Sequence, residues 1–259
     1  IMRIILPYFY ILTLILLFNS PGNAQNWNLD IKGYLSGFKV GIATGKFIKN
    51  NDKILLEIKA ETVGITKLFF PWEQTIAVEA LLLQKDIRPI FYRVDDLREK
   101  TKKGHMELTF KNGLAEVTSA MPSIISDSRR KPVPKELIKN VLDPASAIIA
   151  LGYMSGIANN CNHKIKVFDG RRRFNLFTED MGIEELTPSF FTDSSGEALK
   201  CKFFIKKIAG YSDKELKKHP KSGYIWLQKL QNSNIMMFPV KVQMAIGKGH
   251  FVTHLSVKN

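Results

Sequence analysis

The sequence predicts a mainly β protein, in which a curved antiparallel sheet surrounds one central helical insert. Apolar and polar residues alternate with period two along most of the chain, and Gly and Asn turn signals separate the alternating segments. A single stretch at about 134–156 departs from this pattern and has helix signals instead. Because many short strands joined by tight turns form antiparallel sheets that curve, we expect one β-rich half-barrel domain over 25–259.

The alternating segments give the expected strands in chain order. They lie at 27–31, 54–60, 106–110, 165–167, 174–176, 240–246 and 251–257. Asn112-Gly113 and Asp169-Gly170 are two-residue turn signals, which are typical of β-hairpins. The sequence thus predicts two groups of strands, one before Pro122 and one after Cys161.

The helical insert has its own start and stop signals. The basic, Pro-containing stretch 129–134 is expected to be an exposed linker, and a short helical stretch at 135–142 follows it. Asp143 suits an N-cap, Pro144 suits the first helical position, and Gly156 is expected to end the helix. The helix is apolar on more than one face, so we expect it to be buried in the concave face of the sheet.

Residues 1–24 have the pattern of a secretory signal peptide. Arg3 gives a positive start, 4–18 is an uncharged apolar run, and Gly22 and Ala24 are small residues at the cleavage positions. A run of about 15 residues is short for a membrane span, which needs roughly 20. We expect cleavage after Ala24 and a periplasmic location, with an uncleaved N-terminal anchor as the alternative.

The strongly basic balance indicates anionic partners. The formal net charge is +14, and Arg3 is the only charged residue within 1–24, so the exported chain would carry +13. Outside the cytoplasm such a charge favours lipid headgroups, lipopolysaccharide phosphates or peptidoglycan. Export argues against nucleic acid as a partner. The alternative is that the lysines are solvated and reflect composition alone.

Cys161 and Cys201 are the two cysteines of the chain. An even count in an exported chain favours one disulfide, with two free buried thiols as the alternative. His163 lies close to Cys161, but these two residues alone cannot fill a four-ligand zinc shell. We therefore expect a disulfide and no cofactor.

A basic face is the candidate site for an anionic ligand. Arg171 and Arg173 follow a predicted hairpin turn, and in a strand they face the same way. Lys202 and Lys206 lie on the segment of Cys201, which the disulfide would bring close. Arg suits the binding of phosphate or carboxylate, so these four residues are the predicted anionic-ligand site. The alternative is a solvated rim.

Two apolar segments, 68–72 and 236–238, combine aromatic residues, Met and Leu. Such side chains suit an adaptable site for an apolar ligand. The same segments also suit plain core, and both interpretations stay open at this point.

Patterns that suggest catalysis are weak in their context. The segments 36–39, 126–128 and 221–223 follow the motif order of penicillin-binding enzymes. However, Ser36 stands beside a Gly in a strand-and-turn region, where the motif needs a helix start. The pair at 95–96 is a carboxylate pair that we expect in a solvated loop, whereas glycosidase chemistry needs two carboxylates across a cleft. We expect no catalytic residues.

A metal site is not expected either. His250 and His254 are four residues apart, which on a helix would suit a metal pair. They fall in a predicted strand, where four residues span about 13 Å, so the two imidazoles cannot share one ion.

Several segments, taken together, resemble a family of exported bacterial proteins grouped as domain of unknown function 3108. The matching segments are 34–41, 87–92, 133–134, 143–147, 166–172, Cys201 and 208–210. The resemblance implies a periplasmic half-barrel similar to those of lipoprotein carriers, and it implies no defined activity.

These observations favour a non-enzymatic periplasmic protein that binds an apolar or amphipathic envelope component, such as a lipid or lipopolysaccharide, and supports envelope integrity. One alternative is a scaffold that docks on envelope proteins or peptidoglycan, which a filled concave face would favour. The other is a cell-wall-active serine enzyme, which a Ser–Lys pair within hydrogen-bond reach would favour.

Overall fold

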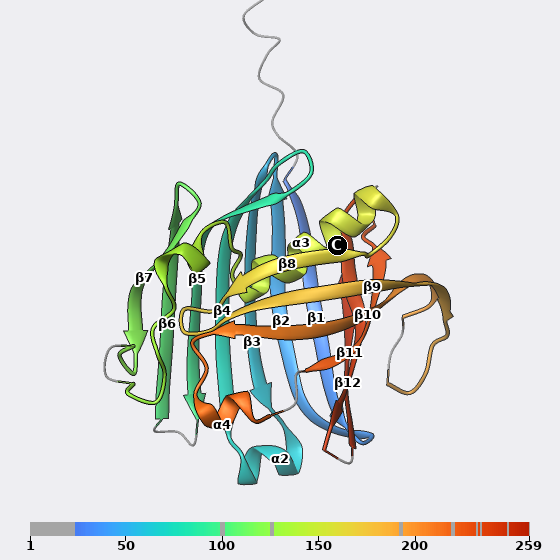
Figure 1. Cartoon of the computed structure of the whole chain (residues 1–259). Helices are drawn as coiled ribbons and strands as arrows, with labels where there is room; N and C mark the ends of the chain where they lie inside the picture. Colours follow the sequence, from blue (N-terminus) through green and yellow to red (C-terminus); the bar gives the residue numbers. More distant parts are fainter. Residues whose placement is uncertain are drawn as a thin grey trace, which may run out of the picture.

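The protein is a single antiparallel sheet curved around one helix. The computed structural model describes residues 24–98, 102–124, 127–191, 194–218, 221–231, 233, 235–247 and 249–258. Over these residues, thirteen strands form a barrel-like sheet that is nearly closed, with the long helix inside it (Figure 1). The expected mainly β fold with a central helix is confirmed. The predicted signal peptide lies almost entirely outside the described residues.

The first half of the chain supplies seven strands and one short helix. These are β1 (Gln25–Leu35), β2 (Phe38–Asn50), β3 (Lys53–Thr62), α2 (Gly64–Phe69), β4 (Trp72–Leu82), β5 (Ile87–Arg98), β6 (Lys102–Lys111) and β7 (Leu114–Met121).

The central insert and the second half supply the remaining elements. These are the 3-10 helix η1 (Lys135–Ile138), α3 (Pro144–Ala158), β8 (His163–Phe168), β9 (Arg173–Leu186), β10 (Gly196–Ala209), α4 (Asp213–Leu216), β11 (Ser222–Lys229), β12 (Met237–Ile246) and β13 (Gly249–Lys258).

The two predicted groups of strands join into one sheet through their outermost members in sequence. The strand order is β7-β6-β5-β4-β3-β2-β1-β13-β12-β11-β10-β9-β8, so β1 pairs with β13. Every alternating segment of the sequence lies within one of these strands. Neighbouring strands are antiparallel throughout the sheet of the described chain.

An irregular segment spans the gap between the edge strands β7 and β8. Lys139 forms a bridge with Leu114 of β7, and Leu142 forms a parallel bridge with Val167 of β8. The backbone N–H of Leu142 donates to the carbonyl of Lys166 at 2.9 Å. The predicted short helix over 135–142 is therefore only the one turn of η1, because its second half pairs with the sheet.

The two predicted hairpin turns have different outcomes. Asn112 and Gly113 form a two-residue turn with φ of 51° and 76°, in the left-handed region that such turns require. Asp169 instead begins a four-residue connection, 169–172, whose last two backbone N–H groups reach the Asp169 carboxylate. The second hairpin exists, but its loop is longer than the Asp-Gly pair predicts.

Helix α3 begins as expected and ends slightly later. Asp143 is its N-cap and Pro144 its first residue, whereas the helix passes Gly156 and ends at Ala158, with Asn159 in the left-handed region. Most of its residues are buried against the concave face of the sheet. No helix of the described residues is both long and apolar enough to cross a membrane.

The alternation of antiparallel strands sorts the connections into two rims. We call the rim with the β1–β2, β3–β4, β5–β6, β10–β11 and β12–β13 connections the α2 rim, since it carries α2. The opposite rim carries the β2–β3, β4–β5, β6–β7 and β11–β12 connections. In Figure 1 the α2 rim is at the bottom, and α3 lies nearer the top.

Candidate ligand-binding cavity

The C-terminal half of α3 is fixed against the opposite rim. A Cβ atom on Gly152 would lie 1.9 Å from the Met237 carbonyl oxygen, and one on Gly156 would lie 2.0 Å from that of Ile235. Only glycine permits this close approach of the helix to the start of β12. The hydroxyl of Tyr153 also donates to a backbone carbonyl of the β4–β5 turn at 2.8 Å. The helix therefore fills the barrel interior at this rim.

The N-terminus of α3 is held by a buried carboxyl group. Asp143 is fully buried, and its Oδ1 accepts hydrogen bonds from the backbone N–H groups of Ala145 at 3.0 Å and Ser146 at 2.8 Å. Burial raises the pKa of Asp143 to about 6, even though those amide bonds act to lower it. Burial, and then the Asp143 charge, also raise the pKa of Tyr92, which lines the cavity described next.

An apolar cavity lies between α3 and the first half of the sheet. Its volume is about 280 Å³. Tyr92 contributes the only side chain with a polar atom among its lining residues, which are Leu29, Ile31, Leu56, Ile58, Ile76, Tyr92, Pro144, Ala145, Ile148, Ile149, Phe238, Pro239 and Leu255. The cavity therefore suits a hydrocarbon better than a polar ligand.

A second cavity of about 280 Å³ lies on the other side of α3, against the second half of the sheet. All of its lining side chains are apolar: Pro144, Ala147, Ile148, Leu151, Val167, Phe174, Leu176, Phe203, Ile205, Ile225, Val242 and Met244. Pro144 and Ile148 line both cavities. Ile148 is 37% exposed, although most of its helix is buried. The two cavities thus flank one partly uncovered turn of α3.

The interior opens toward the α2 rim. Along β3, the inward side chains of Ile54 and Leu56 are buried, whereas those of Ile58 and Ala60 are only partly buried. The inward positions of β12 follow the same trend and end at the exposed Ile246. Since α3 covers the other end, a ligand would enter from the α2 rim.

The mouth of this interior is polar on the β4–β5 side. Gln74 and Trp72 continue the inward face of Ile76 toward the α2 rim, because alternate residues of a strand share a face. The indole Nε1 of Trp72 donates to Asp96, and Arg98 Nε donates to the other Asp96 oxygen at 2.8 Å. An apolar interior with a charged mouth has the pattern of a site for an amphiphile.

The predicted disulfide is present. Cys161 and Cys201 are joined with an S–S distance of 2.10 Å and a Cα–Cα distance of 6.1 Å. Both residues are fully buried. The bond ties the segment after α3 to the inner face of β10, so it helps to hold the helix in place.

The structure does not gather the four predicted anionic-ligand residues into one exposed basic face. Arg173 is only 5% exposed, and its guanidinium donates to the Leu137 carbonyl and to Asn175 Oδ1, each at 2.9 Å. Burial lowers the pKa of Arg173. Sequence alternation placed Arg173 on the same face as Arg171, but it could not show that the η1 segment covers this position.

The other three residues have separate surroundings. Arg171 donates to the backbone carbonyl of Pro122, and burial lowers its pKa. Lys202 lies 3.8 Å from Glu179, an exposed pair that contributes little. Lys206 is exposed on β10. Only the two lysines therefore remain on an exposed face, and one of them has an acidic neighbour.

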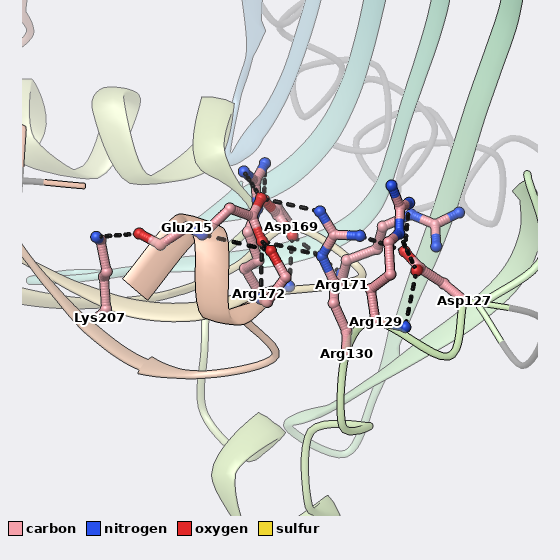
Figure 2. Close-up of polar contacts among 9 residues, drawn as sticks. Asp127, Arg129, Arg130, Asp169, Arg171, Arg172, Lys207 and Glu215 are labelled. Atoms are coloured by element: carbon pink, nitrogen blue, oxygen red, sulfur yellow. Dashed lines mark hydrogen bonds and ion pairs between the residues drawn. The ribbon is translucent and has the colours of Figure 1, made fainter. Parts of the chain in front are cut away.

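The arginines near the β8–β9 turn instead form an ion-pair network (Figure 2). Arg130 reaches Glu215 at 2.9 Å, and Arg172 reaches Asp169 at 2.8 Å. Burial alone would raise the pKa of Glu215, but hydrogen bonds from Arg130 and Ser212 outweigh it and lower the pKa to about 2. The network ties the 127–131 segment to α4, so the predicted exposed linker is partly anchored.

The predicted loop at Asp95 and Asp96 is wrong, because both residues lie in β5. Asp95 faces His105 on the neighbouring strand, with 2.7 Å between Oδ1 and Nδ1. His250 and His254 lie in β13 as predicted. Among the described residues, no group of three or more His, Cys, Asp or Glu could hold a metal ion.

Ser36, the first serine of the penicillin-binding-enzyme pattern, lies in a strand-and-turn region, as its neighbouring residues predicted. Ser36 and Gly37 form the β1–β2 turn with φ of 49° and 88°, and Lys39 lies in β2. Ser36 thus stands in a hairpin turn and does not begin a helix. Ser126 lies outside the described residues.

The two apolar segments of the sequence, 68–72 and 236–238, lie in different environments. Met236, Met237 and Phe238 are buried, and Phe238 also lines the first cavity, so this segment is both core and lining. Leu68 to Phe70 lie on α2 and after it, and all three are highly exposed, so they are neither. The sequence did not single out Ile58 or Ile148 as lining residues, although the inward pattern of 54–60 contained the first of them.

This geometry defines a class of protein: a curved antiparallel sheet with an apolar interior beside a central helix. The chain matches the family described as protein of unknown function (DUF3108) over residues 26–256. The chain belongs to this family. A search among curated proteins finds no match.

Among solved structures, the fold is similar to the crystal structure of a beta-barrel-like protein of domain of unknown function DUF1849 from Brucella abortus. The TM-score is 0.56 at 11% sequence identity, and the match covers 90% of this chain and 97% of that chain. At this identity the similarity concerns the fold alone.

Proposed function

We propose that this protein binds the hydrocarbon part of an amphipathic envelope component, such as a lipid or lipopolysaccharide, without chemical conversion. The observation that carries the proposal is the pair of apolar cavities on the two sides of Ile148. A cavity lined by apolar side chains does not hold water well, because water there lacks polar partners. An acyl chain gains free energy on entering it, at about 0.8 kcal/mol per buried methylene.

The mouth suits the headgroup of such a ligand. Arg98 is exposed at the end of β5, where it pairs with Asp96 at 2.8 Å. Arg binds phosphate and carboxylate groups in a bidentate manner. A ligand with its chain in the interior would place an anionic headgroup near this position.

The open cavities favour ligand capture over a scaffold that uses only its outer surface. Such a scaffold has no need of free interior volume, and its core would be expected to close to normal packing density. The disulfide supports an oxidising compartment, and the apolar run within 1–24 supports export, so we place this activity in the periplasm. We propose that the protein supports envelope integrity there.

The test is the displacement of an apolar fluorescent dye, 1-N-phenylnaphthylamine, by saturated fatty acids of increasing length. Two added methylenes should tighten binding roughly tenfold until the cavity is full, because every 1.4 kcal/mol is about a factor of ten. Affinity that does not depend on chain length would contradict capture of the chain.

A matched pair of variants on β3 locates the binding site. Ile58→Trp fills the first cavity, whereas Leu55→Trp adds the same side chain to the outer face of the same strand. We expect Ile58→Trp to weaken binding by about tenfold or more and Leu55→Trp to leave it within about twofold. Met244→Trp fills the second cavity and serves if Ile58→Trp does not fold. Equal affinity for the fatty acid in all three variants would exclude the interior as the binding site.

A further inference from the structure

The short helix α2 presents a set of large apolar side chains to solvent. Ile65, Leu68, Phe69 and Phe70 are each between 70% and 79% exposed. None of the residues of α2 is buried, so the helix contributes nothing to the core. Contiguous exposed apolar groups of this kind mark interaction sites.

This segment is held in a defined conformation. The backbone N–H of Phe70 donates to the Thr66 carbonyl at 2.8 Å. The hydroxyl of Thr62 donates to the Phe70 carbonyl at 3.0 Å and accepts from the Trp72 N–H at 3.1 Å. The exposed side chains therefore project from a fixed turn between β3 and β4.

Other exposed apolar residues lie on the same rim. Phe38, the first residue of β2 after the β1–β2 turn, is 78% exposed, and α2 contacts β2. Ile246 at the end of β12 and Leu216 in α4 are more than half exposed. These residues surround the side from which the barrel interior opens, as the bottom of Figure 1 shows for α2 and α4.

The charge of this edge is positive. The described residues of its connections and the adjoining strand ends include nine Lys and Arg and five Asp and Glu, over 35–40, 61–73, 96–104 and 210–221. Lys39 and Lys67 are exposed among the apolar residues themselves, and Lys67 reaches Glu61 at 2.5 Å. A set of exposed apolar side chains surrounded by basic residues is complementary to a bilayer with anionic headgroups.

We propose that the α2 rim docks on an anionic lipid bilayer, with Ile65, Leu68, Phe69 and Phe70 inserted among the acyl chains and the surrounding lysines and arginines against the headgroups. Membrane binding of this kind scales with the buried apolar area plus attraction to anionic lipid. It does not rest on the proposed function, since the rim would dock whether or not the interior holds a ligand. If both hold, the mouth of the cavity faces the bilayer.

A site-specific probe tests the insertion. The two native cysteines are paired, so a single added cysteine at Phe69→Cys can be labelled with the environment-sensitive dye NBD. The matched control is Leu83→Cys, which lies in the β4–β5 turn on the opposite rim. We expect NBD emission to rise at position 69 with vesicles of phosphatidylcholine and about one-third phosphatidylglycerol, and to stay constant at position 83. The rise should shrink in about 0.5 M salt, which screens the headgroup attraction.

A second pair of variants measures affinity by vesicle cosedimentation. The double change Leu68→Ser and Phe69→Ser should weaken binding by about tenfold or more, and Leu83→Ser should leave it within about twofold. Both changes lie on the surface, so folding is retained and is checked by circular dichroism.

Three outcomes would overturn the proposal. NBD emission at position 69 could stay unchanged with vesicles, it could change equally at position 83, or the emission at position 69 could rise with protein concentration in the absence of vesicles. The last result would show that a second copy covers the rim. Dye binding in vesicle-free solution is measured on the same variants, so failure of the rim proposal and failure of the cavity proposal are distinguishable.

Discussion

The buried Asp143 at the start of α3 gives a pH dependence of stability with a definite sign. Its pKa is raised from 3.8 to about 6 by burial. Between these values the folded protein binds the proton that the unfolded chain has lost, so stability falls as the pH rises. A shift of about 2 units at about 1.4 kcal/mol each means that the ionised group costs about 3 kcal/mol above pH 6.

The substitution Asp143→Asn removes the charge and keeps an oxygen for the amides of Ala145 and Ser146. The variant should gain about 3 kcal/mol relative to wild type between about pH 4 and about pH 7. Any constant cost of the added amide N–H groups cancels in this difference. Urea unfolding followed by circular dichroism, with both proteins measured at each pH, gives the curve.

Asp127→Asn is the matched control, because its wild-type carboxyl has the opposite shift. The hydrogen bond from Arg129 holds the pKa of Asp127 well below its usual range, so its contribution to stability is lost as the pH falls. This variant should therefore lose stability relative to wild type as the pH rises toward about 4, and its difference from wild type should stay constant above that pH. If the stability difference between Asp143→Asn and wild type did not change between about pH 4 and about pH 7, or if it fell as the pH rose, ionisation of the buried Asp143 would not destabilise the protein.

Two further predictions concern what holds α3 in the barrel. Replacing Cys161 and Cys201 by Ser should lower the free energy of unfolding by about 4 kcal/mol, which is the chain-entropy value for a loop of this length. Denaturant unfolding of wild type and variant, with and without reductant, measures this loss, and equal unfolding midpoints for oxidised wild type and the variant would contradict it. Gly152→Ala should destabilise the folded protein by about 2–3 kcal/mol because its Cβ would clash with the Met237 carbonyl. Ile157→Ala, on the exposed side of the same helix, should cost less than about 1 kcal/mol. Equal thermal unfolding midpoints for the two variants would show that α3 can shift without loss of stability.

The strands and the helix start could be predicted because their signals are local. Alternation over 54–60 and the turn at Asn112-Gly113 act within a few residues, and the Asp143-Pro144 pair caps the helix that it begins. The disulfide also followed from the count of two cysteines in a chain expected to be exported. These features depend little on the rest of the fold.

The site was less predictable because it depends on contacts between distant segments. Arg173 is covered by the η1 segment, where it donates to the carbonyl of Leu137, 36 residues earlier in the chain. No local sequence pattern shows this contact. The apolar run at 68–70 has no periodicity, so its sequence could not separate core from an exposed rim. The same holds for Ile148, whose exposure depends on where the sheet curves away from α3.

Photocrosslinking shows directly whether the interior beside α3 receives an acyl chain. A fatty acid with a diazirine at the end of its chain, bound to the protein and irradiated, labels the residues that surround the chain terminus. We expect labelled peptides from α3 around Ile148 and from the inward positions of β3 and β4, and loss of this label when Ile58 is replaced by Trp. Label confined to outer-face or rim peptides, unchanged in Ile58→Trp, would contradict it.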